Sequence, residues 1–494
     1  MSFAKLDTHC RSLEALEHAL SILGVDEATA MASGGGEKRA EAMAALSGMY
    51  HRQATDPNVR DWIEDAKIEG LDEGQTAAVR ELERSYVNAT CLPSEFVERQ
   101  TLTTMRCEQL WRTARSAGDW AGFAPALEEV VALVRTGAEM RAEVLKLAPY
   151  DALMDQYDPG NRAADIDPVF ADLKVFLKGF AEVALEVQVE RKAKAPAANL
   201  SGAYTVEAQR ALGLALMQAV GFDTNHGSLS VSHHPFCGGV PSDVRLTTRY
   251  RTDEFLSALM GTLHETGHGL YEQNLPKDTA HWPSARARGM SMHESQSLFV
   301  EKQIGRNPAF WEFALPHVEK HLGERLSLDA LLPHLHHVGR GLIRVDADEV
   351  TYPLHVILRY ELEQDILAGR LEVRDIPEAW DAKMQEYLGL ATLDNPKDGP
   401  MQDVHWPGGA FGYFPSYTLG AMMAAQQFAA IVKVNPNVNA EMAKGDFASV
   451  NAWRRDNIWS AASIHSTPEI MAAATGEPLN AVHFIDHLKA RYGA

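Results

Sequence analysis

The hydrophobic positions of this chain recur mainly with the 3.6-residue period of amphipathic helices. Apolar residues spaced at i, i+3, i+4 and i+7 form one buried helical face. This pattern predicts helices at residues 10–23, 37–54, 76–90, 94–117, 123–147, 168–192, 205–220, 350–368 and 417–433. Alternation typical of strands is clear only at residues 228–231 and 244–250. We therefore expect a mainly α fold, in which one large helical body contains a groove and a small β-sheet.

The chain shows no sign of division into independent parts. Its 494 residues are enough for two or three average domains. However, no internal repeat, low-complexity run or Ser/Gly/Pro linker separates them, apart from a short SGGGEK turn near residue 33. We expect a single domain over residues 1–494. Within it, residues 1–225 form one wall, residues 226–417 carry the functional blocks, and residues 418–494 form the C-terminal helices.

One helical segment in the middle of the chain carries an unusual polar motif. Residues 253–275 read DEFLSALMGTLHETGHGLYEQNL, with leucines spaced for one buried face. Thr252 or Asp253 can cap its start, and Pro276 prevents continuation much beyond Leu275. Each of three glycines costs about 1 kcal/mol relative to alanine in a helix interior, so we expect them to leave room for a close neighbour or a ligand. These are Gly261, Gly267 and Gly269.

The motif itself, His-Glu-Thr-Gly-His at residues 264–268, predicts a zinc site. On a helix, His264 and His268 lie one turn apart on the same face, with Cβ atoms about 5–6 Å apart, so both can bind one ion. Glu265 follows the first histidine, where its carboxylate can act as the general base on a metal-activated water. We interpret the motif as zinc-dependent hydrolysis, although cobalt or manganese would accept the same ligands. The alternative is two core histidines satisfied by hydrogen bonds.

A hydrolytic zinc site needs a third protein ligand and one open position. Residues 290–301 form another helical pattern, and its Glu294 is the predicted ligand, which gives a two-His, one-carboxylate site. His293 is the alternative, although it points about 100° away around the helix. Such sites often carry an acid one turn after the third ligand to orient a histidine, but here that position is Leu298. The partner of the histidine must therefore come from elsewhere.

The charge balance and the cysteines restrict the partners and the compartment. The chain has 46 basic and 67 acidic residues, a net charge of −21, and no basic stripe, which argues against nucleic acid and anionic membranes. No run of about twenty apolar residues is present, and the N-terminus lacks the apolar core of a signal peptide. Scattered cysteines without metal-binding spacing indicate reduced thiols and a cytoplasmic location. They are Cys10, Cys91, Cys107 and Cys237.

Several short blocks around the motif agree, in order, with one known family. They are HPF at 234–236, DVRLT at 243–247, HETGH at 264–268, HES at 293–295, IRVDAD at 343–348, GPMQDVHW at 399–406 and GGAFGYFPSY at 408–417. The N-terminal stretch SGGGEKRAEAMAALSGMYH also agrees. On these blocks the chain resembles the carboxypeptidase Taq family of zinc metallocarboxypeptidases. The resemblance implies a helical peptidase of the gluzincin, neurolysin-like type, with the small sheet beside the zinc helix.

The resemblance also implies an activity and its partners. We expect a broad-specificity carboxypeptidase that acts on peptides with a free C-terminus and forms a homodimer. Related helical zinc peptidases place a histidine and a tyrosine from a late loop opposite the metal, which makes His405 and Tyr413 the candidates for stabilising the oxyanion. The resemblance further implies that the DVRLT and QDVHW blocks close one end of the groove, which would limit substrate length.

A carboxypeptidase must recognise the terminal carboxylate, for which a planar arginine fork is well suited. Arg344 is the leading candidate, and the resemblance points the same way; Arg245 competes with it, and His234 is a further candidate for substrate contact. Arg359 is interpreted as a structural ion pair. Three nearby acids are candidates for orienting Arg344 or the metal ligands. They are Asp346, Asp348 and Glu349.

Two other classes of function stay open at this point. A zinc oligopeptidase or endopeptidase acting on short peptides would use the same metal set without a carboxylate clamp. A helical binding protein with an inactive site is the other, but the intact Glu265 argues against it, because a purely structural zinc site needs no base. The position of Pro353 is also open, since it can start the helix at 350–368 or kink it.

Overall fold

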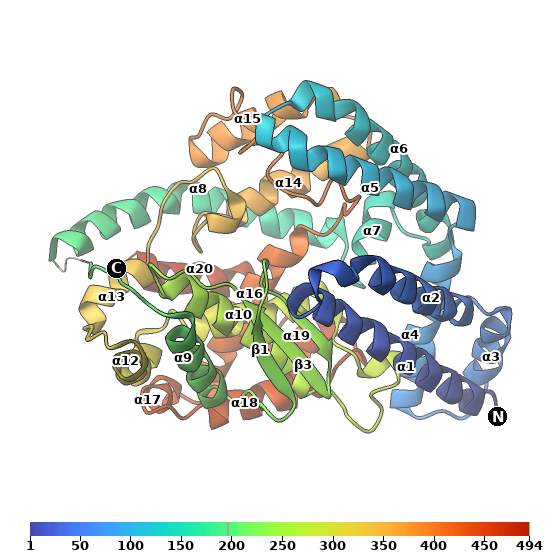
Figure 1. The fold of residues 1–494 in the computed structure, drawn as a ribbon, viewed down its shortest axis with the longest axis horizontal. Helices are drawn as coiled ribbons and strands as arrows, with labels where there is room; N and C mark the ends of the chain where they lie inside the picture. Colours follow the sequence, from blue (N-terminus) through green and yellow to red (C-terminus); the bar gives the residue numbers. More distant parts are fainter. Residues whose placement is uncertain (195–196, 494) are drawn as a thin grey trace.

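The computed structural model describes residues 1–194 and 197–493. Helices make up most of it (Figure 1). Those of the first half are α1 (Ser2–Thr29), α2 (Gly36–Ala54), α3 (Pro57–Lys67), α4 (Glu73–Thr90), α5 (Ser94–Ala117), α6 (Trp120–Leu145), α7 (Pro149–Met154), α8 (Ala163–Lys194) and α9 (Val206–Ala219). Every helix predicted in this half is found, and the predicted mainly α class is confirmed.

The second half contains the remaining helices and two π-helical segments. They are α10 (Leu256–Gln273), α11 (Gly289–Leu298), η3 (Phe299–Ile304), α12 (Pro308–Leu322), α13 (Leu328–Leu335), α14 (Tyr352–Leu367), α15 (Ile376–Leu388), α16 (Pro415–Val434), α17 (Val438–Met442), α18 (Ala448–Arg454), η6 (Arg455–Trp459), α19 (Thr467–Thr475) and α20 (Ala481–Tyr492). Pro353 lies in the first turn of α14, so it starts this helix and does not kink it.

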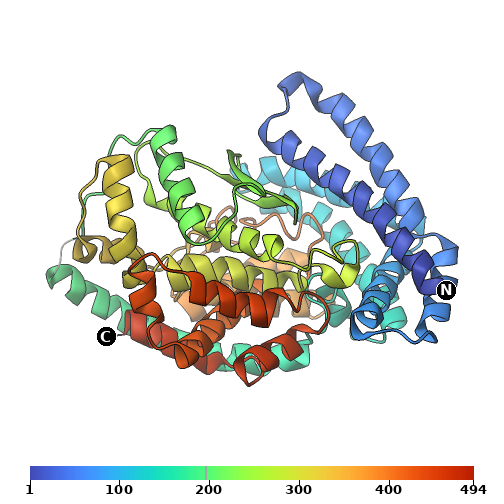
Figure 2. The same cartoon turned by 90° about the horizontal axis from the view of Figure 1, so that it is seen from below.

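The first helices project from one end of the molecule as a long hairpin (Figure 2). α1 packs against α2 and α3, and its far end reaches the sheet, where Ser21 Oγ donates to Gly239 O. A small hydrophobic cluster of its own, which includes Leu6, Val59 and Ile63, lies between these helices. The main core is separate and extends through the helices from α5 to α20.

The sheet has three short strands in the order β1-β3-β2, namely β1 (Gly227–Val231), β3 (Asp243–Thr248) and β2 (Cys237–Val240). β1 runs parallel to β3, and β2 runs antiparallel to it. Two of the strands were predicted; β2 was missed because it is only four residues long and half glycine, with no alternation to read. β3 packs on α10, so the sheet lies beside the motif helix, as predicted.

α10 begins later than the sequence suggested. Its N-cap residue is Phe255, and the prediction that Thr252 or Asp253 caps it is wrong. The Asp253 carboxylate accepts hydrogen bonds from the Arg251 side chain, while Glu254 accepts from the backbone N–H of Ser257. The helix ends at Gln273, before Pro276, as expected.

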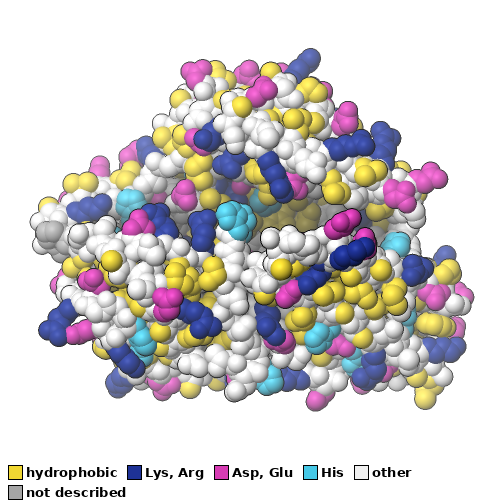
Figure 3. All heavy atoms as spheres, in the orientation of Figure 1, with side chains coloured by type: hydrophobic (Ala, Val, Ile, Leu, Met, Phe, Trp, Pro, Cys, Tyr) yellow, Lys and Arg dark blue, Asp and Glu magenta, His cyan; other side chains and the backbone are white. Residues whose placement is uncertain are grey.

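A hollow crosses the middle of the face shown in Figure 3, between the part that carries α5, α6 and α15 and the part that carries the sheet. A cleft of about 790 Å³ reaches His264 and Glu301, and Met260 and Gly261 of α10 also line it. No helix among the described residues is long and apolar enough to cross a membrane.

Candidate metal centre and active site

Three side chains from two neighbouring helices converge at the motif. α10 supplies His264 and His268, and α11 supplies Glu294; their ligand atoms all lie within 4.8 Å of one another. Glu294 Oε2 is 3.9 Å from His264 Nε2 and 3.5 Å from His268 Nε2. Ligand atoms around one tetrahedral zinc ion lie about 3.3 Å apart, so this set fits a divalent metal with only a small contraction and leaves a fourth position for a ligand.

Glycines bring the helices close enough for this convergence. A Cβ added at Gly267 would lie 2.2 Å from Gln296 O and 2.5 Å from Ser297 Cα, so the backbones of α10 and α11 are in direct contact there. On the other side of α11, a Cβ added at Gly420 of α16 would lie 2.8 Å from Glu294 Cβ. α11 is therefore held between two glycine contacts, next to its metal ligand. The expectation that the α10 glycines admit a close neighbour is met at Gly267 and also at Gly269, where an added Cβ would lie 2.7 Å from Phe222 Cε2.

Glu301 orients the first histidine. Its Oε2 lies 3.0 Å from His264 Nδ1, which leaves His264 Nε2 to face the metal position. Glu301 belongs to the π-helical segment η3, whose wider turn changes the direction of its side chain relative to a regular continuation of α11. Burial by itself would raise the pKa of the Glu301 carboxyl. Lys302 and His264 outweigh burial and hold this pKa well below its usual value, so the carboxylate stays charged. The acid expected at position 298, where the chain has Leu298, is thus supplied by Glu301, about one turn later.

The second histidine has a different partner. His293 Nδ1 lies 2.5 Å from His268 Nδ1, and His293 Nε2 lies 2.7 Å from Glu272 Oε1. His293 is outside the three-residue group, so the geometry favours Glu294 as the third ligand. Burial, followed by the neighbouring His293 and His264, lowers the pKa of His268 well below its usual value, which keeps the ring neutral and able to bind a cation.

Glu265 combines burial with a position beside the metal group. Its residue is only 7% exposed. Burial raises the pKa of its carboxyl to about 7; His264 opposes the shift, and Glu294 adds to it. A carboxyl with a pKa near neutrality can accept a proton and return it during one reaction cycle.

Arg344 lies in a compact buried network. Asp403 Oδ1 accepts from Arg344 Nη2 at 2.8 Å, and the Tyr352 hydroxyl accepts from Nη1 at 2.6 Å. The other oxygen of Asp403 accepts from Arg359 Nε at 2.6 Å, which makes Arg359 the structural ion pair that was predicted. The ring of Tyr417 covers the Arg344 guanidinium, with 4.9 Å between its centroid and Cζ.

Two of the three acids proposed to orient Arg344 or the metal ligands bind other groups, so that prediction is wrong for Asp348 and Glu349. Asp348 accepts from the backbone N–H groups of Gly339, Val350 and Thr351. Glu349 accepts from Arg491 and Tyr492 of α20. For Asp346, no contact with Arg344 is found in the described part of the chain, although it borders the cleft.

The late loop brings its aromatic residues together near the metal group. The rings of His405 and Tyr413 lie 5.5 Å apart, and His405 Nε2 is 3.3 Å from the Tyr417 hydroxyl. Burial lowers the pKa of His405 to about 4. Burial and the charges of nearby groups, which include Glu294, raise the pKa of Tyr413, so its hydroxyl keeps its proton. The sequence did not indicate a role for Tyr417, because it is the last residue of the aromatic block at 408–417 and no spacing distinguishes it from its neighbours.

Two predicted residues are not brought into this cluster. His234 lies exposed on the turn between β1 and β2, beside His233. Arg245 lies on β3, where its guanidinium binds both oxygens of Asp243, at 2.5 and 2.6 Å. Neither side chain contacts the metal group among the residues that the structure describes.

Two histidines and a glutamate around one position, with a buried carboxyl of near-neutral pKa beside them, define a metallopeptidase site. Comparisons with known proteins agree. Residues 5–492 match the family described as Carboxypeptidase Taq (M32) metallopeptidase. The chain is 40% identical over 491 residues to thermostable carboxypeptidase 1 of Thermus thermophilus, which covers 95% of this chain and 94% of that protein. It is 33% identical over 481 residues to carboxypeptidase 1 of Bacillus subtilis, covering 96% and 94%.

Solved structures show the same relation over the whole fold. Metallocarboxypeptidase 1 of Trypanosoma cruzi matches with a TM-score of 0.96 at 40% identity, covering 100% of this chain and 99% of that one. The M32 carboxypeptidase from Deinococcus radiodurans R1 matches with a TM-score of 0.94 at 32% identity, with the same coverage. The chain belongs to the carboxypeptidase Taq (M32) family of metallopeptidases. This supports a metallocarboxypeptidase and not the oligopeptidase alternative.

Proposed function

We propose that this protein is a zinc-dependent carboxypeptidase that removes the C-terminal residue from peptides with broad specificity. The observation that carries the proposal is the pairing of a two-His, one-Glu group with a buried arginine network beside it. Tyr417 joins the two, because its ring covers the Arg344 guanidinium and it lies on α16 three residues before Gly420, which packs against Glu294. A metal group alone would serve any peptidase, whereas an arginine fork beside it suits a terminal carboxylate.

His264, His268 and Glu294 would hold the metal. When bound there, the ion supplies Lewis-acid activation of water and of the scissile carbonyl. Glu301 fixes the tautomer of His264 through Nδ1, and His293 supports His268 in the same way.

Glu265 moves the proton in this proposal. Its carboxylate takes a proton from the attacking water and returns it to the leaving amine. With its pKa raised to about 7, the group is a strong enough base for the first transfer and a strong enough acid for the second. His405 and Tyr413 donate hydrogen bonds to the oxygen that becomes negative, and Tyr417 is close enough to share this role.

Arg344 binds the terminal carboxylate of the substrate. The network contains two arginines and one carboxylate, Asp403, so one positive charge is left for an incoming anion. The side chain of Arg344 is 5% exposed beneath Tyr417, so the carboxylate reaches it only when that ring turns aside. Arg245 is more open, at 41% exposure, but both oxygens of Asp243 already occupy its fork.

The test compares an N-blocked dipeptide that has a free C-terminus with its C-terminally amidated twin. We expect zinc-dependent release from the free acid only, abolished by chelation and by Glu265→Gln. Equal cleavage of the two peptides would contradict carboxypeptidase action, and the absence of metal-dependent cleavage of either would contradict the proposed chemistry.

A pair of matched variants tests the carboxylate site. Arg344→Lys keeps the charge but loses the fork, and we expect kcat/KM for the free acid to fall about 30- to 100-fold, the equivalent of losing one charged hydrogen bond. Arg245→Lys is the control and should change kcat/KM less than about 3-fold. A larger loss of kcat/KM in Arg245→Lys than in Arg344→Lys would instead assign binding of the terminal carboxylate to Arg245.

The proposal extends to a homodimer in the cytoplasm. The family resemblance supports the dimer, and the four cysteines, all free, support a reducing compartment. Light scattering coupled to size-exclusion chromatography tests the first part, since a monomer mass near 54.4 kDa would refute it.

A further inference from the structure

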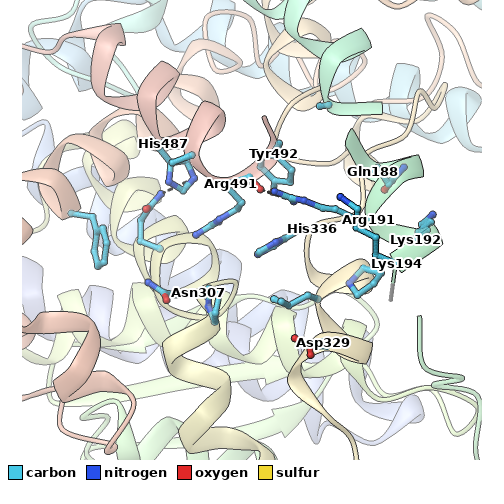
Figure 4. A pocket seen from close by; sticks show the side chains of 17 residues that line it. Gln188, Arg191, Lys192, Lys194, Asn307, Asp329, His336, His487, Arg491 and Tyr492 are labelled. Atoms are coloured by element: carbon cyan, nitrogen blue, oxygen red, sulfur yellow. Dashed lines mark hydrogen bonds between the residues drawn. The ribbon is translucent and has the colours of Figure 1, made fainter. Parts of the chain in front are cut away.

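A second cavity, of about 590 Å³, lies apart from the metal group, between α8, α13 and α20. Figure 4 shows Arg191, Lys192 and Lys194 of α8 on one side and His487 of α20 on the other, with His336 between them. Lys192 and Pro333 also border the active-site cleft, so the two spaces are neighbours. None of the metal ligands lines this cavity.

The cavity is cationic, although the protein as a whole carries a net charge of −21. Four of its side chains are Lys or Arg, and Asp329 is its one carboxylate among the described lining residues. Lys192 and Lys194 form no ion pair within the described ranges. A concentration of positive charge in an acidic protein needs a reason, because it attracts anions.

Behind the wall of the cavity lies a buried cluster of ion pairs that includes Arg491. Arg491 donates to Glu349 Oε2 at 3.0 Å and to Lys302 O at 2.8 Å, and its side chain is only 9% exposed. Lys302 and Arg306 both pair with Glu301. The cluster thus holds three cations and, with Asp348 close enough to interact with Arg306, three carboxylates. Its charges balance, and the cations that line the cavity itself are not part of this balance apart from Arg491.

Arg491 has capacity left for a ligand. Both of its hydrogen bonds come from Nη1; in the part of the chain that the structure describes, Nη2 and Nε have no partner. Nor are these two atoms enclosed, because neither is among the buried polar atoms without a partner. They lie on a side chain that lines the cavity. An anion in the cavity would accept hydrogen bonds from these donors and pair with Lys192 and Lys194 of the lining.

The rest of the lining is mixed, with polar side chains such as Gln188, Gln303 and Asn307 beside apolar ones. The apolar residues include Leu332 and Pro333 of α13, Phe428 of α16 and Ala184 of α8. A volume of this size is typical of sites for small organic molecules. From this combination we infer a binding site for a small organic acid: a carboxylate facing Arg491 and the α8 cations, on an apolar body that packs against Leu332 and Phe428. This inference goes beyond the proposed peptidase activity and does not depend on it.

Calorimetric titration of the zinc-loaded protein tests the inference. The probes are 4-phenylbutyrate, its uncharged twin 4-phenylbutanamide, and inorganic phosphate, an anion without an apolar body. The protein is Glu265→Gln, saturated with an uncleaved peptide so that the active-site cleft is occupied. We expect phenylbutyrate to bind once per chain, at least about 10-fold more tightly than either comparison probe, because only it uses both parts of the cavity.

Variants locate the binding. Lys192→Gln combined with Lys194→Gln should weaken phenylbutyrate at least about 10-fold, and so should Leu332→Glu, which puts a like charge into the apolar part. Lys178→Gln, on the same helix but outside the lining, is the matched control and should bind normally.

Three results would overturn the inference. They are equal affinity for the acid and the amide, binding that both cavity variants leave unchanged, and displacement of the probe by the peptide, which would place it in the active-site cleft. Each is read from binding alone, so failure here is distinct from failure of the peptidase assay.

Discussion

Replacing Gly267 by alanine tests whether backbone contact between α10 and α11 sets the geometry of the metal group. The new methyl group would lie 2.2 Å from Gln296 O and 2.5 Å from Ser297 Cα, both backbone atoms. A comfortable contact is about 3.4 Å or more, so the two helices must separate by roughly 1 Å. The substitution leaves every proposed ligand and catalytic side chain in place.

The size of the effect follows from two opposing contributions. Overpacking against a rigid backbone costs about 3 kcal/mol, the upper end of the usual range. Alanine is better than glycine in a helix interior by about 1 kcal/mol. We therefore expect Gly267→Ala to lower the free energy of unfolding by about 2 kcal/mol. Glu294 lies two residues before Gln296, so a shift of this size should also reduce kcat roughly 100-fold.

Gly261→Ala in the same helix is the matched control. A Cβ there meets only Thr248 Oγ1, at 4.0 Å, so the helix gains propensity without a clash and should be stabilised by up to about 1 kcal/mol. Urea unfolding of the two variants and the wild type measures the difference. Equal stability of the two variants would refute the reasoning, and so would a Gly267→Ala protein with normal stability and activity.

Three further predictions concern the charged groups around the site. Glu301→Gln should weaken metal affinity about 10- to 100-fold, measured by competition with a chromogenic chelator, because His264 loses its charged partner; unchanged affinity would exclude this role. Asp403→Asn should destabilise the protein by about 3–5 kcal/mol in urea, since it leaves Arg344 and Arg359 buried without a carboxylate. Burial by itself would raise the pKa of the Asp403 carboxyl, but the charges of the two arginines outweigh burial and hold this pKa below its usual value of 3.8. The stability gained over Asp403→Asn is therefore full above that value, declines as pH falls below it, and is lost only as pH falls through the lower pKa of the folded protein. Urea unfolding from pH 6 to 3 would show the start of this decline, and a constant difference between the two proteins would contradict it.

Much of the fold is visible in the sequence because its signals are local. Helical periodicity found α2, α5 and α16 to within about two residues of their ends. Local patterns failed to predict elements whose conformation depends on contacts elsewhere in the chain or departs from regular helix geometry. The four residues of β2 join the sheet only through pairing with β3, and the π-helical η3 looks like a continuation of α11.

In the candidate site, too, the sequence predicted some residues and not others. Spacing alone indicated His264, His268 and Glu294, because a helix turn and a neighbouring helix fix their relation. The partners of these residues come from long-range packing, which no spacing records. Asp403 lies 59 residues after the Arg344 that it binds, and Glu301 reaches His264 only because η3 widens its turn. The sequence does suggest that a buried Arg344 needs a carboxylate partner. However, three acids lie closer to Arg344 along the chain than Asp403 does, so the sequence favoured those acids instead. They are Asp346, Asp348 and Glu349.

The two glycine contacts that hold α11 also decide how the metal is coupled to folding. Where ligands are gathered by the ion itself, removing it unfolds the chain, and binding energy is folding energy. Here Gly267 and Gly420 fix the ligand helix against α10 and α16 through the surrounding core. The ion adds only the mass-action contribution of a ligand to a site that already exists. We therefore expect one divalent metal to replace another without unfolding of the chain, so that the metal content of the protein would follow the supply of ions around it.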